Sequence, residues 1–107
     1  MATKLARDAA RALTNDVDFK RGNIVIDKQF RFINVKVHYD VAHTYKLYDS
    51  TIAYVHCGML YITIPEGLAT KTTMDKVVAI LEMWGKYDHL SLLKKYHGKF
   101  FNLGRMS

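Results

Sequence analysis

The sequence lacks the features that mark secreted, membrane-spanning or repetitive chains. Its single cysteine, Cys57, excludes an internal disulfide and fits a reducing compartment. One proline and six glycines are too few for a collagen-like or linker-like chain. No apolar run approaches the roughly 20 residues that a membrane helix needs, and the N-terminus lacks the apolar stretch of a secretory signal. We therefore expect a cytoplasmic protein that does not associate with membranes.

The composition is that of a folded domain rather than of a disordered chain. Half of the 107 residues are apolar and 24% are charged, which is close to ordinary globular usage. The length suits one domain, so we expect a single α+β domain over residues 1–107. Lys and Arg number 16 against 10 Asp and Glu, which gives a net charge of +6.

Residues 23–64 alternate between apolar and polar side chains, which predicts β-strands. We expect strands at 23–28, 31–40, 44–48, 51–56 and 59–64. The clearest is 31–40, where one face carries Ile33, Val35, Val37 and Tyr39. Because the connections are short, successive strands should pair antiparallel. The predicted fold is therefore α+β, an antiparallel β-meander of about four to five strands with one N-terminal helix and two C-terminal helices packed on it.

Helices are expected on both sides of the strand region. The first covers residues 3–13, with Thr3 as the N-cap. The second begins with a capping-box-like sequence at 72–75 and ends before Gly85. The third follows Asp88 as its N-cap and runs to residue 98. The second helix should face the sheet with Met74, Val77, Val78, Ile80, Leu81 and Trp84, and should face away with Asp75, Ala79 and Glu82.

A tight hairpin at Cys57-Gly58 sets the register of two predicted strands. One face should carry the core residues Ala53, Val55, Leu60, Ile62 and Ile64. The other should carry Ile52, Tyr54, His56, Met59 and Tyr61. Because aromatic side chains are enriched at interfaces, we predict that Tyr54, Tyr61 and His56 bind a protein partner. A basic stripe of Lys4, Arg7 and Arg11 on the first helix would be its rim and steer an acidic partner. The alternative is that a helix of the same chain covers the two tyrosines.

Catalytic and metal-binding patterns are missing from the sequence. The five histidines do not have metal-ligand spacing, and no carboxylates are placed for acid–base work. Cys57 follows His56 but should lie in a turn, and neighbouring strand side chains point to opposite faces. We therefore expect no enzyme activity, no metal and no cofactor.

Basic residues occur in three separate groups along the chain. Besides the stripe on the first helix, they are Lys20 with Arg21, and Lys94, Lys95 and Lys99 with Arg105. They could contact phosphates while tyrosines stack on bases, or they could form a solvated surface. No helix-turn-helix, zinc-finger or single-strand-binding signature supports the nucleic-acid interpretation.

Residues 51–81 combine a strand containing Ile52-Ala53, a short hairpin, Gly67, and Thr70-Lys71-Thr72-Thr73 opening a helix. This pattern resembles a family of small uncharacterised bacteriophage proteins. The resemblance implies a phage origin and the cytoplasm of a host cell, and it implies no particular functional residues.

Three functional hypotheses follow from the sequence. The leading hypothesis is a small non-enzymatic phage accessory protein that binds a host protein, such as a defence complex, and inhibits or redirects it. One alternative is a basic accessory protein that binds nucleic acid weakly and without sequence preference. The other is a structural or homo-oligomeric virion component.

Overall fold

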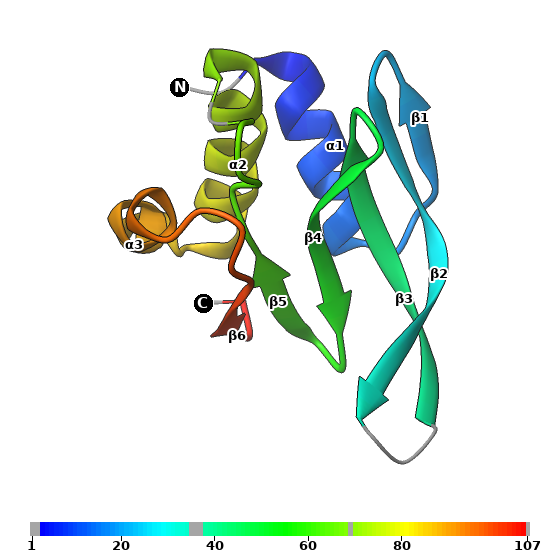
Figure 1. Ribbon diagram of the computed structural model, residues 1–107. Helices are drawn as coiled ribbons and strands as arrows, with labels where there is room; N and C mark the ends of the chain where they lie inside the picture. The colour runs from blue at the N-terminus through cyan, green and yellow to red at the C-terminus, as the bar shows by residue number, and fades with distance from the viewer. Residues whose placement is uncertain (1–2, 35–37, 69, 107) are drawn as a thin grey trace.

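The computed structural model describes residues 3–34, 38–68 and 70–106, with 29–34 and 38–42 as backbone only (Figure 1). The strands are β1 (Phe19–Arg21), β2 (Ile24–Asn34), β3 (His38–Leu47), β4 (Ser50–His56), β5 (Met59–Ile62) and β6 (Phe101–Gly104). The helices are α1 (Lys4–Thr14), α2 (Lys71–Trp84) and α3 (Leu90–Lys95), with a short 3-10 helix η1 (Tyr87–His89) before α3.

The described strands form one six-stranded antiparallel sheet in the order of the chain. The predicted α+β class is confirmed, with one N-terminal and two C-terminal helices and slightly more strands than expected. The additional strands are β1 and β6, the two edges of the sheet. Both are short, and a short strand has too few residues for a clear alternation.

The predicted strand at 31–40 is wrong, because the chain reverses within it. Asn34 of β2 pairs with His38 of β3. Val35 and Val37 lie outside the described residues. The predicted strands at 23–28 and 44–48 are parts of β2 and β3. The alternation continues through the reversal without a Gly or Pro, so the sequence lacks the usual signal for a turn.

Two turns and a bulge determine which residues of β4 are buried. Cys57 and Gly58 have φ angles of 53° and 76° and form the predicted tight turn. The turn between β3 and β4 is Tyr48-Asp49, one residue earlier than the gap at 49–50 between the strands predicted at 44–48 and 51–56. Tyr45 pairs with Ala53, but Lys46 pairs with Thr51. The extra residue between these pairs, Ile52, is a bulge and is fully buried, so it does not lie on the tyrosine face as predicted.

Helices α1 and α2 lie parallel, side by side, on one face of the sheet (Figure 1). At their N-terminal ends Thr3 contacts Asp75, and at their C-terminal ends the indole of Trp84 donates to the Thr14 hydroxyl at 2.9 Å. Thr3 is the N-cap of α1, as predicted. The buried side of α1 is mostly alanine, which lets two helices approach closely: Ala6, Ala9, Ala10, Ala12 and Leu13.

Of the residues predicted to face the sheet, Val77, Ile80 and Leu81 are fully buried. Trp84 is also buried, but its indole donates to Thr14 of α1. Met74 and Val78 are only half-buried. Ala79 was expected to face away but is buried, because α2 packs against α1 as well as the sheet and therefore buries more than one side. The N-cap is Thr70 rather than Thr72, and the start of α2 is Lys71.

The last part of the chain also differs from the prediction. Asp88 lies inside η1 and caps no helix. Helix α3 ends at Lys95, three residues short of the predicted end at 98, and Leu93 is its buried residue. None of the helices in the described parts of the chain is long and apolar enough to cross a membrane.

Candidate functional site

Two tyrosines of the β4–β5 hairpin stack on the sheet face that points away from α1 and α2. Tyr54 pairs with Tyr61 and His56 pairs with Met59, which is the predicted register. The tyrosine rings are parallel within 7°, with centroids 4.8 Å apart. Both side chains are half-buried, whereas Ala53 and Ile62, which point to the helices, are fully buried. The aromatic pair is therefore accessible and is not part of the main core.

Residues of the C-terminal segment complete this surface, and the sequence interpretation missed them. The Phe100 ring is tilted against Tyr54 with centroids 5.5 Å apart, and Phe100 is 38% exposed. The Asn102 amide donates to the Tyr61 hydroxyl at 3.3 Å and lies 3.7 Å from the Met59 sulfur. The alternation of Phe101, Asn102 and Leu103 was the signal that could have indicated β6. We call Tyr54, His56, Met59, Tyr61 and Phe100 the tyrosine patch.

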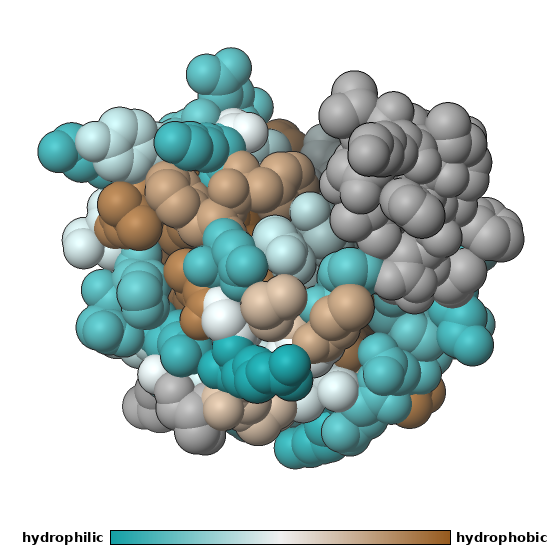
Figure 2. Space-filling view, turned by 90° about the horizontal axis from the view of Figure 1, so that it is seen from below, coloured by the Kyte–Doolittle hydropathy of each residue, from teal (hydrophilic) through white to brown (hydrophobic). Residues whose placement is uncertain are grey.

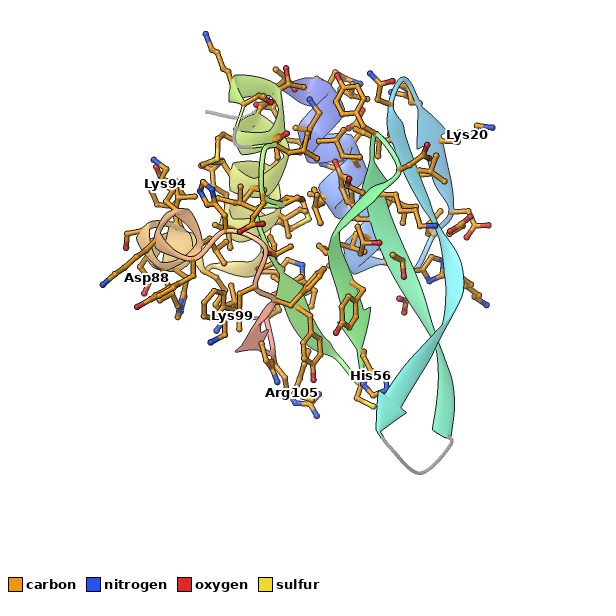
Figure 3. All side chains as sticks on the ribbon, in the orientation of Figure 1. Lys20, His56, Asp88, Lys94, Lys99 and Arg105 are labelled. Carbon is orange, nitrogen blue, oxygen red and sulfur yellow. The ribbon has the colours of Figure 1, made fainter. Side chains whose placement is uncertain are left out.

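Arg105 lies at the hairpin end of the tyrosine patch. A Cβ atom at Gly58 would stand only 2.8 Å from the Arg105 Nη1 atom, so the guanidinium packs against the turn where glycine leaves room. The Cys57 sulfur is 3.5 Å from His56 Nε2 in the same turn. Figure 3 shows His56 and Arg105 at this end of the sheet. Figure 2 views the molecule from below, and on that face hydrophobic side chains lie among hydrophilic ones.

The predicted basic stripe lies elsewhere. Lys4 and Arg11 are on α1 and contact Asp8, at 3.1 and 3.5 Å, and Arg21 of β1 approaches the same carboxylate at 3.7 Å. The hydrogen bond from Lys4 is the main reason why the pKa of Asp8 is lowered. Arg7 is exposed on the same helix. Because α1 covers the other face of the sheet, these residues do not form a rim around the tyrosines.

A polar cluster joins the N-terminal ends of α1 and α2. The Asp75 carboxylate accepts hydrogen bonds from the Thr3 N–H at 2.9 Å and the Thr3 hydroxyl at 2.7 Å. It also pairs at 3.2 Å with Lys76, which is only 7% exposed. Burial would raise the pKa of Asp75, but the hydrogen bonds from Thr3 and Lys76 outweigh it and lower the pKa. Burial raises the pKa of the nearby Tyr45. This cluster holds the N-terminal ends of the two helices together.

His43 is a second buried polar residue, at 4% exposure, on the helix side of β3. Its Nε2 atom lies 3.0 Å from Asp18 and its Nδ1 atom 3.5 Å from Asp16, so it ties the loop after α1 to the sheet. The two carboxylates approach different ring nitrogens and do not converge on one point. Within the described residues, no group of three or more His, Cys, Asp or Glu side chains could hold a metal ion.

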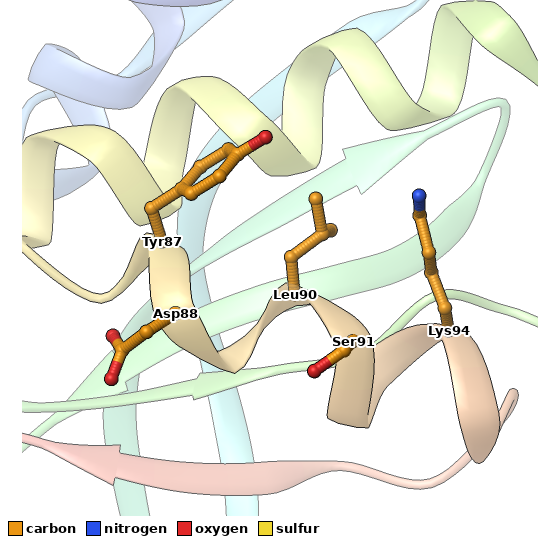
Figure 4. Close-up of a pocket in the computed structure, with 5 residues that line it drawn as sticks. All are labelled: Tyr87, Asp88, Leu90, Ser91 and Lys94. Atoms are coloured by element: carbon orange, nitrogen blue, oxygen red, sulfur yellow. The ribbon is translucent and has the colours of Figure 1, made fainter.

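Two surface grooves are weaker candidates for a binding site. The groove in Figure 4 has a volume of about 300 Å³ and is lined by Tyr87, Asp88, Leu90, Ser91 and Lys94. Apart from Leu90, which is half-buried, its lining side chains are exposed. A similar groove lies beside β1 and is lined by residues of 18–27. Small-molecule sites usually bury most of their ligand, which such open surfaces cannot do.

Comparison of the chain with protein-family models, with curated proteins and with solved structures finds no match. The site must therefore be judged by its geometry. The tyrosine patch is the strongest candidate, because it brings together three aromatic rings, a methionine and a histidine from three segments of the chain.

Proposed function

We propose that this chain is a small non-enzymatic phage accessory protein that binds a host protein through the tyrosine patch and thereby inhibits or redirects it. The observation that carries the proposal is the stacked pair of Tyr54 and Tyr61, half-exposed on the sheet face that the helices leave open. Stacked rings lose little conformational freedom on binding, and aromatic anchors of this kind supply much of the energy of protein interfaces. The phage origin and the host setting rest on the resemblance of residues 51–81.

The arrangement of the rings favours a protein over a nucleic acid. Bases bind by stacking on an aromatic face. One face of each tyrosine is already occupied by the other tyrosine, and Phe100 is tilted against Tyr54. The neighbouring Met59 adds a flexible apolar side chain, which is typical of surfaces that bind other proteins.

A capture experiment with a matched tyrosine control tests the proposal. Tagged protein is incubated with bacterial lysate, with and without nuclease treatment, and the bound proteins are identified and their affinity measured. We expect Tyr61→Ala to weaken binding by about 1 kcal/mol or more, which is roughly a fivefold loss of affinity. Tyr87→Ala removes a tyrosine that is 54% exposed on η1, outside the patch, and should bind as the wild type does.

The fold of the variants is checked by thermal unfolding before binding is compared. Tyr61→Phe keeps the stacked ring and removes only the hydroxyl that Asn102 contacts, so it should bind nearly normally even if Tyr61→Ala is destabilised. Equal affinity of Tyr61→Ala and wild type would contradict the proposal. Capture that disappears after nuclease treatment would favour the nucleic-acid alternative, and a stable homo-oligomer that buries the patch would favour the virion component.

A further inference from the structure

The C-terminal part of the chain carries most of the excess positive charge. Residues 89–107 contain four basic side chains, at Lys94, Lys95, Lys99 and Arg105, and no Asp or Glu. They account for four of the six net positive charges of the whole chain. We call residues 94–105 the basic segment. Its charge is not balanced within its own sequence, in contrast to α1, where Asp8 lies between Lys4 and Arg11.

The basic segment is not neutralised by the fold either. In the described parts of the chain, no ion pair involves Lys95, Lys99 or Arg105, whereas Lys4, Arg11 and Arg21 all approach Asp8. The Lys95 and Lys99 ammonium groups lie over aromatic rings, each 5.5 Å from the centroid of Tyr96 or Phe101. Glu66 packs against Gly98, where a Cβ atom would stand 3.1 Å from its Cγ atom. One neighbouring carboxylate leaves the segment strongly positive.

Arg105 brings this positive charge to the tyrosine patch. Its guanidinium packs against the turn at Gly58, which joins His56 to Met59 of the patch. Figure 3 shows Arg105 and His56 at the same end of the sheet. The Lys99 ammonium lies over Phe101, which pairs with the buried Ile62 and therefore points to the helix side. One guanidinium group thus borders the aromatic anchor, and the lysines lie further along the basic segment.

We infer that the partner segment docking on the tyrosine patch is acidic, with Asp or Glu side chains beside an apolar or aromatic residue. The apolar residue would contact the tyrosine patch, and a carboxylate beside it would pair with Arg105. Complementary charge of this kind steers association and sets the register of a complex. The inference rests on the proposed function and adds the chemistry of the partner to it.

A polyanion such as single-stranded nucleic acid would also be attracted to the basic segment, but its bases would find few free ring faces. Tyr96 and Phe101 are tilted against each other with centroids 6.1 Å apart, and lysine side chains lie over both rings. The carboxylates of an acidic protein segment need only exposed ammonium and guanidinium groups in order to pair with this surface. The arrangement of this surface therefore favours an acidic protein segment over a nucleic acid.

Fluorescence anisotropy with short labelled peptides tests the inference. The probe has Glu and Asp around a central Leu-Trp pair, and its counterpart has Gln and Asn in their place. We expect the acidic peptide to bind, and the neutral one to bind at least roughly tenfold more weakly at physiological salt. The variant Arg105→Gln should lose roughly fivefold in affinity for the acidic peptide. The variant Lys4→Gln removes the same charge from α1 and should lose less than about twofold.

The matched variants separate a local site from simple net charge. Equal losses in Arg105→Gln and Lys4→Gln, or equal binding of the acidic and neutral peptides, would overturn the inference. Tighter binding of a thymidine oligonucleotide than of the acidic peptide would overturn it in favour of nucleic acid. If no acidic peptide binds while capture of a protein from lysate still depends on Tyr61, the proposed function stands and only the acidic chemistry of the partner is wrong.

Discussion

Individual polar residues hold the two layers of this protein together. Asp75 joins α1 to α2 at one end of the helix pair, and Trp84 joins α2 to Thr14 at the other. The Asp75 carboxylate contacts Thr3 at the start of α1, where the helix dipole favours a negative charge. The same carboxylate is the counter-ion of Lys76, which is almost completely buried. Asp75 therefore stabilises both the start of α1 and the buried charge of Lys76.

We expect Asp75→Asn to lower the free energy of unfolding at neutral pH by about 2–3 kcal/mol, because Lys76 would lose its counter-ion. The folded pKa of Asp75 lies below its ordinary value of 3.8. Its contribution is thus complete above that value and is lost as the pH falls through the lower folded pKa. Urea unfolding at neutral and at acidic pH should show a difference between wild type and variant that shrinks in acid.

Asp8→Asn is the matched control for this prediction. Asp8 also contacts several basic groups, but these are well exposed, so the variant should lose much less stability than Asp75→Asn. Equal losses in the two variants would show that the Asp75 cluster has no special role.

At the scale of elements, the pairing of α1 with α2 explains why α2 is buried on more than one side. Val77, Ile80 and Leu81 are buried in the core that the helices share with the sheet, and α1 packs along α2. The alanines of α1 let this contact be close. The opposite side of the sheet has no such partner among the described helices, which leaves the β4–β5 tyrosines accessible.

Leu81→Ala tests the orientation of α2. Leu81 is fully buried, so its truncation should cost about 2–5 kcal/mol in the free energy of unfolding. Glu82→Ala changes the next residue, which is exposed, and should stay within about 0.5 kcal/mol of the wild type. Chemical denaturation measures both values, and a loss below about 0.5 kcal/mol for Leu81→Ala would contradict the orientation described above.

At the scale of the whole molecule, the charge is unevenly distributed. The cations of α1 and β1 gather around Asp8, whereas those of the C-terminal segment remain unpaired beside an aromatic surface. A net charge of +6 therefore does not describe a uniformly basic protein. The attraction of the protein for charged partners should therefore depend on the C-terminal segment.

We expect nucleic acid to bind weakly and without sequence preference. The basic groups lie on separate elements, and the ring faces that could stack on bases are largely used within the protein. Any binding of a labelled oligonucleotide should decrease steeply as salt is raised, since it would depend on phosphate contacts. A nanomolar complex at physiological salt with a strong preference for one sequence would contradict this and support a nucleic-acid-binding protein.

The sequence by itself determined the α+β class, the α1 cap at Thr3, the buried side of α2 and the register of the β4–β5 hairpin. These depend on local periodicity and on turn residues, such as Gly58, that act over a few positions. It also determined that Tyr54 and Tyr61 lie side by side, because a hairpin register places opposed side chains in contact.

Only the tertiary structure decided what surrounds those tyrosines. Phe100, Asn102 and Arg105 reach the hairpin from more than 40 positions further along the chain, and no local pattern encodes such a contact. Tertiary packing also decides three other features. They are the bulge at Ile52, the burial of Ala79 in the paired helices, and the separation of the α1 cations from the tyrosine patch. Each depends on how distant elements pack, and the free energy of that packing is shared among many residues.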